Sequence, residues 1–181
     1  MDVLAVVVTA VWAMLPAYVP NNAAVLAGGG RPIDAGRTWG GRRVLGDGKT
    51  WRGTFVGWGV GAGLALALNR LNDTAAESIS GIPDPFPITV VLALPLGAML
   101  GDIGASFLKR RTGRERGAPF LGFDQLDFVV GALLLGVLAN PSWFFNTFEP
   151  AVLLTVLILT PALHVTTNGI AYLIGVKDEP W

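Results

Sequence analysis

Five long apolar stretches divide this chain of 181 residues and leave most of its charges in the segments between them. A helix that crosses a bilayer needs ~20 mostly apolar residues, because the hydrocarbon layer is ~30 Å thick and each helical residue rises ~1.5 Å. Only 14% of the residues are charged, whereas ~25% is usual in a soluble domain. We therefore predict an all-α, polytopic membrane protein of one domain, residues 1–181, with five transmembrane helices. These cover about residues 3–19, 53–68, 88–108, 126–145 and 151–174.

The positive charges predict how these helices are oriented. Of the 13 Lys and Arg residues, six lie in the loop at about 20–52 and five in the loop at about 109–125. Cytoplasmic loops carry an excess of Lys and Arg, so both loops are expected in the cytoplasm. The chain is then a multi-pass protein of the cytoplasmic membrane, with its N-terminus outside and its C-terminus in the cytoplasm. Residues 1–30 hold no Lys or Arg, which argues against a cleaved signal peptide.

Glycines recur four residues apart inside the second and third stretches. The pairs are Gly57 and Gly61, Gly59 and Gly63, and Gly97 and Gly101. Small residues at this spacing let the backbones of membrane helices approach closely. We therefore expect tight contacts between helices at these positions.

Three carboxylates lie at the predicted cytoplasmic ends of the apolar stretches: Asp102, Asp124 and Asp127. Asp102 shares one helix face with Ser106 and Lys109, and Asp124 and Asp127 share another. Because a short loop joins the two helices, the three carboxylates are expected to converge. The alternative is a structural role, in which the cations of that loop neutralise them.

A functional role is favoured because an ionisable side chain inside a membrane segment is costly. Carboxylate oxygens suit Mg²⁺, which usually completes its shell with phosphate oxygens and water. The chain has no cysteine and a single histidine, which excludes the usual zinc sites. The three carboxylates therefore predict a magnesium site that receives a phosphorylated substrate.

A glycine-rich segment around Lys49 is a second candidate for phosphate contact. It ends like a P-loop, but Arg43 stands where that motif needs a glycine five positions before Gly48. Such a segment can still present backbone N–H groups and a cation to phosphate. For the other loop cations, the alternative is that they set the topology and contact anionic lipid.

The spacing of Ser106, Lys109 and Arg110, followed by Asp124 and Asp127, resembles the signature of the membrane CTP-transferase family, which includes the CDP-diacylglycerol synthases. The chain departs from the bacterial pattern, since it lacks the H-G-G element, has Glu115-Arg116 where that pattern has K-D, and has Gln125 where it has Arg. It is more similar to the archaeal branch, the CDP-archaeol synthases. That resemblance rests on the blocks at 15–24, 45–53, 101–117 and 122–132.

The resemblance implies that the phosphate of an unsaturated archaeal ether lipid, 2,3-bis-O-geranylgeranyl-sn-glycerol 1-phosphate, attacks the α-phosphorus of CTP and releases pyrophosphate. Two Mg²⁺ ions, ~3.5–4 Å apart, would assist. A cavity open to both cytosol and membrane is expected, since the lipid tails stay in hydrocarbon. The implied site has Asp102, Lys109, Asp124 and Asp127 as catalytic residues, with the three carboxylates as metal ligands. Its predicted contacts with CTP or phosphate are Asn22, Lys49, Thr50, Arg52, Ser106, Arg110 and Arg114.

Other functions remain as alternatives. Within enzymes they are a CDP-diacylglycerol synthase and a CTP-dependent polyprenol kinase. The alternative outside enzymes is a small cation channel or carrier, although the charges of such a protein would be expected near the bilayer midplane. No nucleic-acid partner is expected. The basic segment at 23–48 is expected to be mobile without substrate, because it is rich in glycine and poor in apolar anchors.

Overall fold

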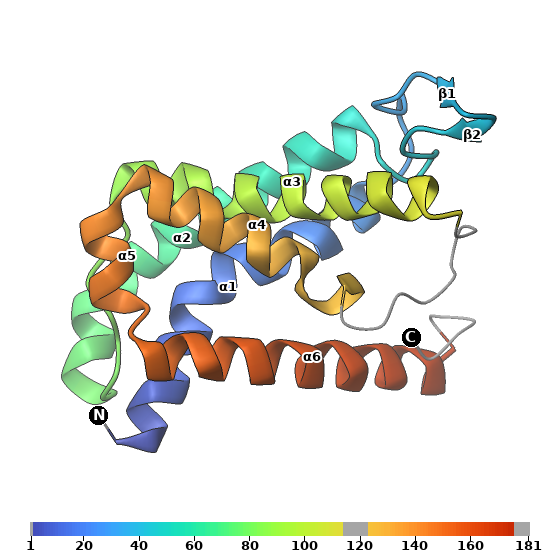
Figure 1. Cartoon of the computed structure of the whole chain (residues 1–181). Helices are drawn as coiled ribbons and strands as arrows, with labels where there is room; N and C mark the ends of the chain where they lie inside the picture. Colours follow the sequence, from blue (N-terminus) through green and yellow to red (C-terminus); the bar gives the residue numbers. More distant parts are fainter. Residues whose placement is uncertain (1, 114–122, 176–181) are drawn as a thin grey trace.

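The computed structural model describes residues 2–113 and 123–175, which form six α-helices and one short hairpin. Helix α3 packs most extensively on α4, and α1 packs most extensively on α2, while α6 lies against α1 and α4 (Figure 1). The helices are α1 (Val3–Ala27), α2 (Trp51–Ser78), α3 (Ile88–Arg111), α4 (Phe123–Ala139), α5 (Pro141–Thr147) and α6 (Pro150–Leu173). The hairpin strands are β1 (Thr38–Trp39) and β2 (Arg42–Arg43), which pair antiparallel.

Three helical segments are long and apolar enough to cross a membrane: α1, α3 and the part of α6 at Pro150–Thr167. A shorter apolar helix covers Gln125–Ala139, within α4. Helix α2 has 28 residues, but glycines and polar residues lower its hydropathy, and it is not one of the three. The prediction of a mostly helical membrane chain is confirmed, and the helix bounds differ from those expected.

The first helix extends well beyond its predicted end at residue 19 and includes both Pro16 and Pro20. A proline within a helix removes one hydrogen bond and tends to bend the helix rather than end it in a membrane. Glycines of α2 face the prolines of α1. A Cβ atom at Gly61 would lie 2.6 Å from the Pro16 carbonyl oxygen, and one at Gly57 2.6 Å from that of Pro20. The predicted close contact at this glycine pair is confirmed.

Glycines also bring α3 and α4 into direct backbone contact. A side chain at Gly97 would collide with the backbone of Gly131, and one at Gly101 with the carbonyl of Asp127. This confirms the close helix contact predicted for Gly97 and Gly101. It also sets Asp127 against the turn of α3 that carries Asp102. By contrast, a side chain at Gly59 or Gly63 would meet nothing within 4 Å in the described part of the chain, so this pair makes no such contact there.

The predicted fourth helix, residues 126–145, is interrupted at Asn140 and forms α4 and α5 instead. The Asn140 side chain accepts a 2.9 Å hydrogen bond from the backbone N–H of Trp143, and Pro141 opens α5. An Asx cap followed by proline is a strong helix start, because proline has no N–H to donate to a preceding turn. Helix α4 therefore ends where the chain turns over into α5.

Candidate active site

An ion pair joins two of the predicted site residues across 53 positions of sequence. The Lys49 ammonium lies 2.5 Å from a carboxylate oxygen of Asp102, and the two side chains are 25% and 22% exposed. Lys49 lies just before α2, and Asp102 lies in the C-terminal half of α3. The structure therefore brings together the cation of the glycine-rich segment and the carboxylate of the third apolar stretch.

A small cavity surrounds this pair and is called here the polar pocket. Its volume is about 130 Å³. Helices α1, α2 and α3 and the segment before α2 line it with Asn21, Ala24, Val25, Gly48, Lys49, Thr50, Gly53, Thr54, Met99 and Asp102. Thr50 caps α2, because its hydroxyl accepts a 3.1 Å hydrogen bond from the Gly53 N–H. A helix N-terminus beside a lysine favours anionic groups.

The loop that carries Lys49, residues 28–50, is folded around the carboxylate of Asp34. This side chain is 1% exposed and forms a 2.7 Å ion pair with Arg43. It also accepts hydrogen bonds of 3.0 Å from the N–H groups of Leu45 and Gly46, and one of 3.1 Å from Gly36. The Arg43 guanidinium, and after it these N–H groups, hold the pKa of Asp34 well below its usual range despite burial. The loop is thus organised around one buried carboxylate.

Arg111, at the end of α3, attaches this loop to the helix that bears Asp102. Its guanidinium donates hydrogen bonds to the backbone carbonyls of Trp39, at 2.6 Å, and of Arg43, at 2.9 Å. It also lies over the rings of Trp39 and Phe107, at 5.3 and 5.6 Å. Figure 1 shows the hairpin beside this end of α3. The loop therefore contacts α3 at two places, Arg111 and the Lys49–Asp102 pair.

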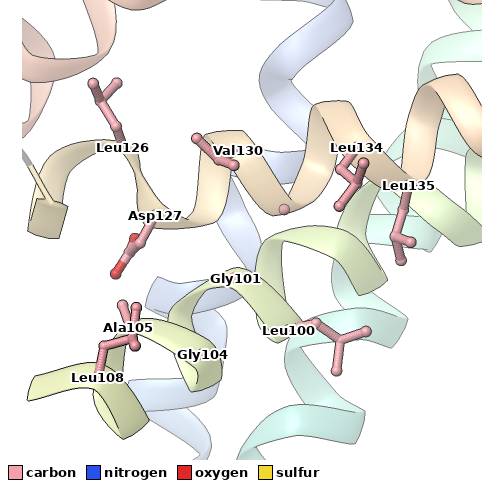
Figure 2. A pocket seen from close by; sticks show the side chains of 11 residues that line it. Leu100, Gly101, Gly104, Ala105, Leu108, Leu126, Asp127, Val130, Leu134 and Leu135 are labelled. Carbon is pink, nitrogen blue, oxygen red and sulfur yellow. The ribbon is translucent and has the colours of Figure 1, made fainter. Parts of the chain in front are cut away.

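A larger cavity, called here the apolar cavity, lies between α3 and α4 and has a volume of about 660 Å³. Helix α3 contributes Leu100, Gly101, Gly104, Ala105 and Leu108, and helix α4 contributes Leu126, Asp127, Val130, Gly131, Leu134 and Leu135. Asp127 is its charged residue. Figure 2 shows this side chain pointing from α4 toward α3 near Ala105. The arrangement suits a ligand with an apolar body and one polar end.

Two of the predicted metal ligands thus line different cavities, Asp102 the polar pocket and Asp127 the apolar cavity. The side chain of Asp124 lies outside the part of the chain that the structure describes. Within the described residues, no three His, Asp or Glu side chains lie close enough to hold a metal ion. Because the side chain of Asp124 is not among them, the convergence of the three carboxylates stays a prediction. The donor chemistry still fits Mg²⁺, since the oxygens are hard and the chain has no thiolate.

The other predicted substrate contacts are distributed around these cavities. Asn22 and Arg52 are exposed and line neither cavity. Ser106, Lys109 and Arg110 are half-buried in the last turns of α3, and Arg114 lies outside the described residues. Of the pair Asn21 and Asn22, which the sequence offers either as a turn or as a contact to a base or phosphate, Asn21 lines the polar pocket, whereas Asn22 was the predicted contact.

These features define a class of protein: a membrane-embedded helical enzyme with a charged site beside an apolar cavity. A solved structure described as an intramembrane enzyme for archaeal membrane lipid biosynthesis has the same fold, with a TM-score of 0.71. It is 36% identical to this chain, and the match covers 88% of this chain and 92% of that one.

The chain belongs to the CarS-like CDP-archaeol synthase family, whose profile matches residues 3–181. A CDP-archaeol synthase of Haloarcula marismortui is 64% identical over 181 residues, which is the full length of both chains. That of Halobacterium salinarum is 65% identical over the same length. A third, from Methanospirillum hungatei, is 51% identical over 93% of this chain and 100% of its own. The predicted family and its enzyme class, a nucleotidyltransferase, are thereby confirmed.

Proposed function

We propose that this chain transfers the cytidylyl group of CTP to the phosphate of 2,3-bis-O-geranylgeranyl-sn-glycerol 1-phosphate, giving CDP-archaeol and pyrophosphate. Full-length relatives at 64% and 65% identity carry the name CDP-archaeol synthase. The observation that carries the proposal is the Lys49–Asp102 pair in a polar pocket, one helix away from a large apolar cavity. A charged nucleotide and an apolar lipid need two such environments side by side.

In the proposed reaction, an oxygen of the lipid phosphate attacks the α-phosphorus of CTP. A new P–O bond forms there, and the bond to the β-phosphate oxygen breaks, so that pyrophosphate leaves with its electrons. The lipid phosphate is already ionised at neutral pH, so no strong general base is required. Transfers of this kind depend on positioning and on charge neutralisation. Lys49 would supply a positive charge to the phosphates, and Lys109 is a second candidate on α3.

Magnesium binding remains part of the proposal. Asp102 and Asp127 lie on neighbouring helices in backbone contact, and Asp124 lies one helical turn before Asp127. These three carboxylates would hold the metal, and Lys49 would then move from Asp102 to a phosphate. Bound Mg²⁺ would neutralise charge on the attacking and leaving oxygens.

The lipid is proposed to occupy the apolar cavity between α3 and α4, with its phosphate near Asp127. The cavity walls are almost entirely aliphatic and glycine residues, which suits isoprenoid tails. Val130 and Leu134 are 60% and 56% exposed, so in a bilayer this part of the wall would face lipid. A lipid could then enter sideways without leaving the hydrocarbon.

The proposed topology has five membrane crossings, with the site on the cytoplasmic side of the cytoplasmic membrane. Helix α2 and the pair α4–α5 would provide the two crossings beyond α1, α3 and α6. The last turn of α6 lies at the same end of the molecule as the basic hairpin, and the start of α1 lies at the opposite end (Figure 1). This agrees with an outer N-terminus and an inner C-terminus.

The reaction class is tested by incubating purified protein with Mg²⁺, the lipid phosphate and CTP labelled with ³²P at either the α or the γ position. The proposal expects α-label in the lipid and γ-label in pyrophosphate only. Label that enters lipid from the γ position would contradict it and indicate a kinase. Replacing the ether lipid by a diacyl phosphatidate tests the acceptor, and equal rates would contradict the ether-lipid assignment.

A further inference from the structure

The side-chain oxygen of Asn21 is buried in the wall of the polar pocket and has no hydrogen-bond donor among the residues that the structure describes. Three further buried side-chain atoms lack partners in the described residues, and all are nitrogen donors, on Trp12, Arg110 and Arg111. Buried polar groups are nearly always paired, so an unpaired acceptor in a ligand-sized cavity indicates a missing donor. Asn21 reaches this position because α1 continues beyond Pro20.

Within the described residues, the polar groups of the pocket wall bond to partners other than the Asn21 oxygen. The ammonium of Lys49 is bound to Asp102, and the hydroxyl of Thr54 donates to the Thr50 carbonyl at 2.9 Å. We infer that a bound ligand supplies the donor for Asn21. The triphosphate of a nucleotide presents essentially only acceptors at neutral pH. In CTP the donors are the 4-amino group of cytosine and the two ribose hydroxyls.

The size of the polar pocket and its wall at Asn21, Ala24, Val25 and Met99 favour the base, which leaves the Lys49–Asp102 edge for the phosphates. Its volume of about 130 Å³ is too small for a whole nucleoside triphosphate. A cavity of this size suits one small ring. Ala24, Val25 and Met99 provide apolar surface, and Asn21 provides a polar group beside them. Flat heteroaromatic ligands are typically held by apolar walls with a few placed polar groups.

We propose that Asn21 selects cytosine, with its side-chain oxygen accepting a hydrogen bond from the 4-amino group of CTP. This inference rests on the proposed function, since it assumes that CTP is the nucleotide. UTP carries a carbonyl oxygen at the same place, so binding it would set two acceptors against each other. A site built to hydrogen-bond an N–H of its substrate strongly rejects analogues without that N–H, because the buried acceptor is then left unpaired.

The test compares kcat/KM for CTP and UTP in the wild type and in Asn21→Ala. The wild type is expected to prefer CTP by at least ~100-fold. In Asn21→Ala, kcat/KM for CTP is expected to fall by ~10- to 100-fold, mainly through KM, while the value for UTP stays within about twofold. Asn21→Asp keeps an acceptor and is expected to retain the preference. Asn146→Ala, an exposed asparagine of α5, is the matched control and leaves the preference unchanged.

Three outcomes would overturn the inference. An equal fall for CTP and UTP would assign Asn21 to the metal or to folding, and a change confined to dCTP against CTP would assign it to the ribose. The third outcome comes from an experiment on the wild-type protein alone, which remains informative if the Asn21→Ala variant does not fold. The triphosphate of 2-pyrimidinone riboside, which lacks the 4-amino group, must bind at least ~10-fold more weakly than CTP in calorimetry. Equal binding refutes the role of Asn21, whereas label transfer from CTP to lipid would still stand.

Discussion

At the scale of single residues, Lys49 and Asp102 were each predicted from a local signal: a lysine after glycines, and a carboxylate within an apolar stretch. Their pairing was not predictable, because it joins positions 53 residues apart through the fold of the loop. The role of Asp34 was missed for a related reason. Its burial depends on the N–H groups of residues up to twelve positions away, and the sequence marks it only as an acid among cations.

Removing the positive charge of Lys49 should impair the chemical step. Lys49→Met is expected to lower kcat by ~10²-fold, because phosphoryl transfer loses a preorganised cation, and Lys49→Arg is expected to recover part of it. The measurement is the initial rate of label transfer from α-labelled CTP. Arg70→Met, at an exposed cation of α2, is the control. Equal rates for Lys49→Met and the control would remove Lys49 from the site.

The lowered pKa of Asp34 predicts how the loop responds to pH. The charged form is favoured in the folded state, so its stabilising effect is complete above the unfolded pKa of ~4 and is lost as pH falls below that value. Protease resistance of the 28–50 loop should therefore be constant from pH 8 to 5 and decline below ~4. Asp34→Asn should lose resistance at every pH. A wild-type transition near neutral pH would contradict this account.

At the scale of elements, the sequence predicted where the helices lie, because hydropathy and glycine spacing are local properties. The predicted helix ends were wrong where the end depends on packing against another helix or on the start of the next one. Helix α1 passes through Pro20 with glycines of α2 packed against it, and the expected fourth helix ends where Asn140 and Pro141 start a new one. The first of these differences shifts Asn21 from a loop into the pocket.

The crossing of α3 and α4 should not tolerate even one methyl group. Gly101→Ala would set a Cβ atom into the carbonyl of Asp127, and we expect the thermal unfolding temperature to fall by several degrees, together with activity. Gly59→Ala is the matched control, since nothing lies within 4 Å of that position and alanine is the better helix former. Unfolding temperatures in detergent report both. Equal temperatures for the two variants would show that the helices can separate without cost.

At the scale of the whole molecule, α3 separates the two cavities. Its Asp102 side lines the polar pocket with α1 and α2, and its Gly101 side lines the apolar cavity with α4. The sequence predicted one cavity open to cytosol and membrane, and one converging set of carboxylates. In the described residues, the polar pocket and the apolar cavity lie on two sides of α3. In the proposed reaction, this arrangement would let a soluble nucleotide and a membrane lipid approach from different directions.

Filling the apolar cavity should affect the lipid and spare the nucleotide. Val130→Trp is expected to raise KM for the lipid phosphate by ~10-fold and to leave KM for CTP unchanged, because Val130 lines only that cavity. Steady-state kinetics in mixed micelles with either substrate varied give both constants. Leu157→Trp, on the exposed face of α6, is the control. A matching rise in KM for CTP would place the nucleotide in the same cavity.

The central claim is that cytidylyl transfer takes place at the Lys49–Asp102 pair. Its most direct test is the rate at which α-labelled cytidylyl groups enter the ether lipid in Asp102→Asn, compared with Asp73→Asn, an exposed carboxylate of α2. The account predicts a fall of at least ~10²-fold for Asp102→Asn at saturating substrates, with the unfolding temperature retained, and a wild-type rate for the control. A rate for Asp102→Asn within twofold of the wild type would contradict it.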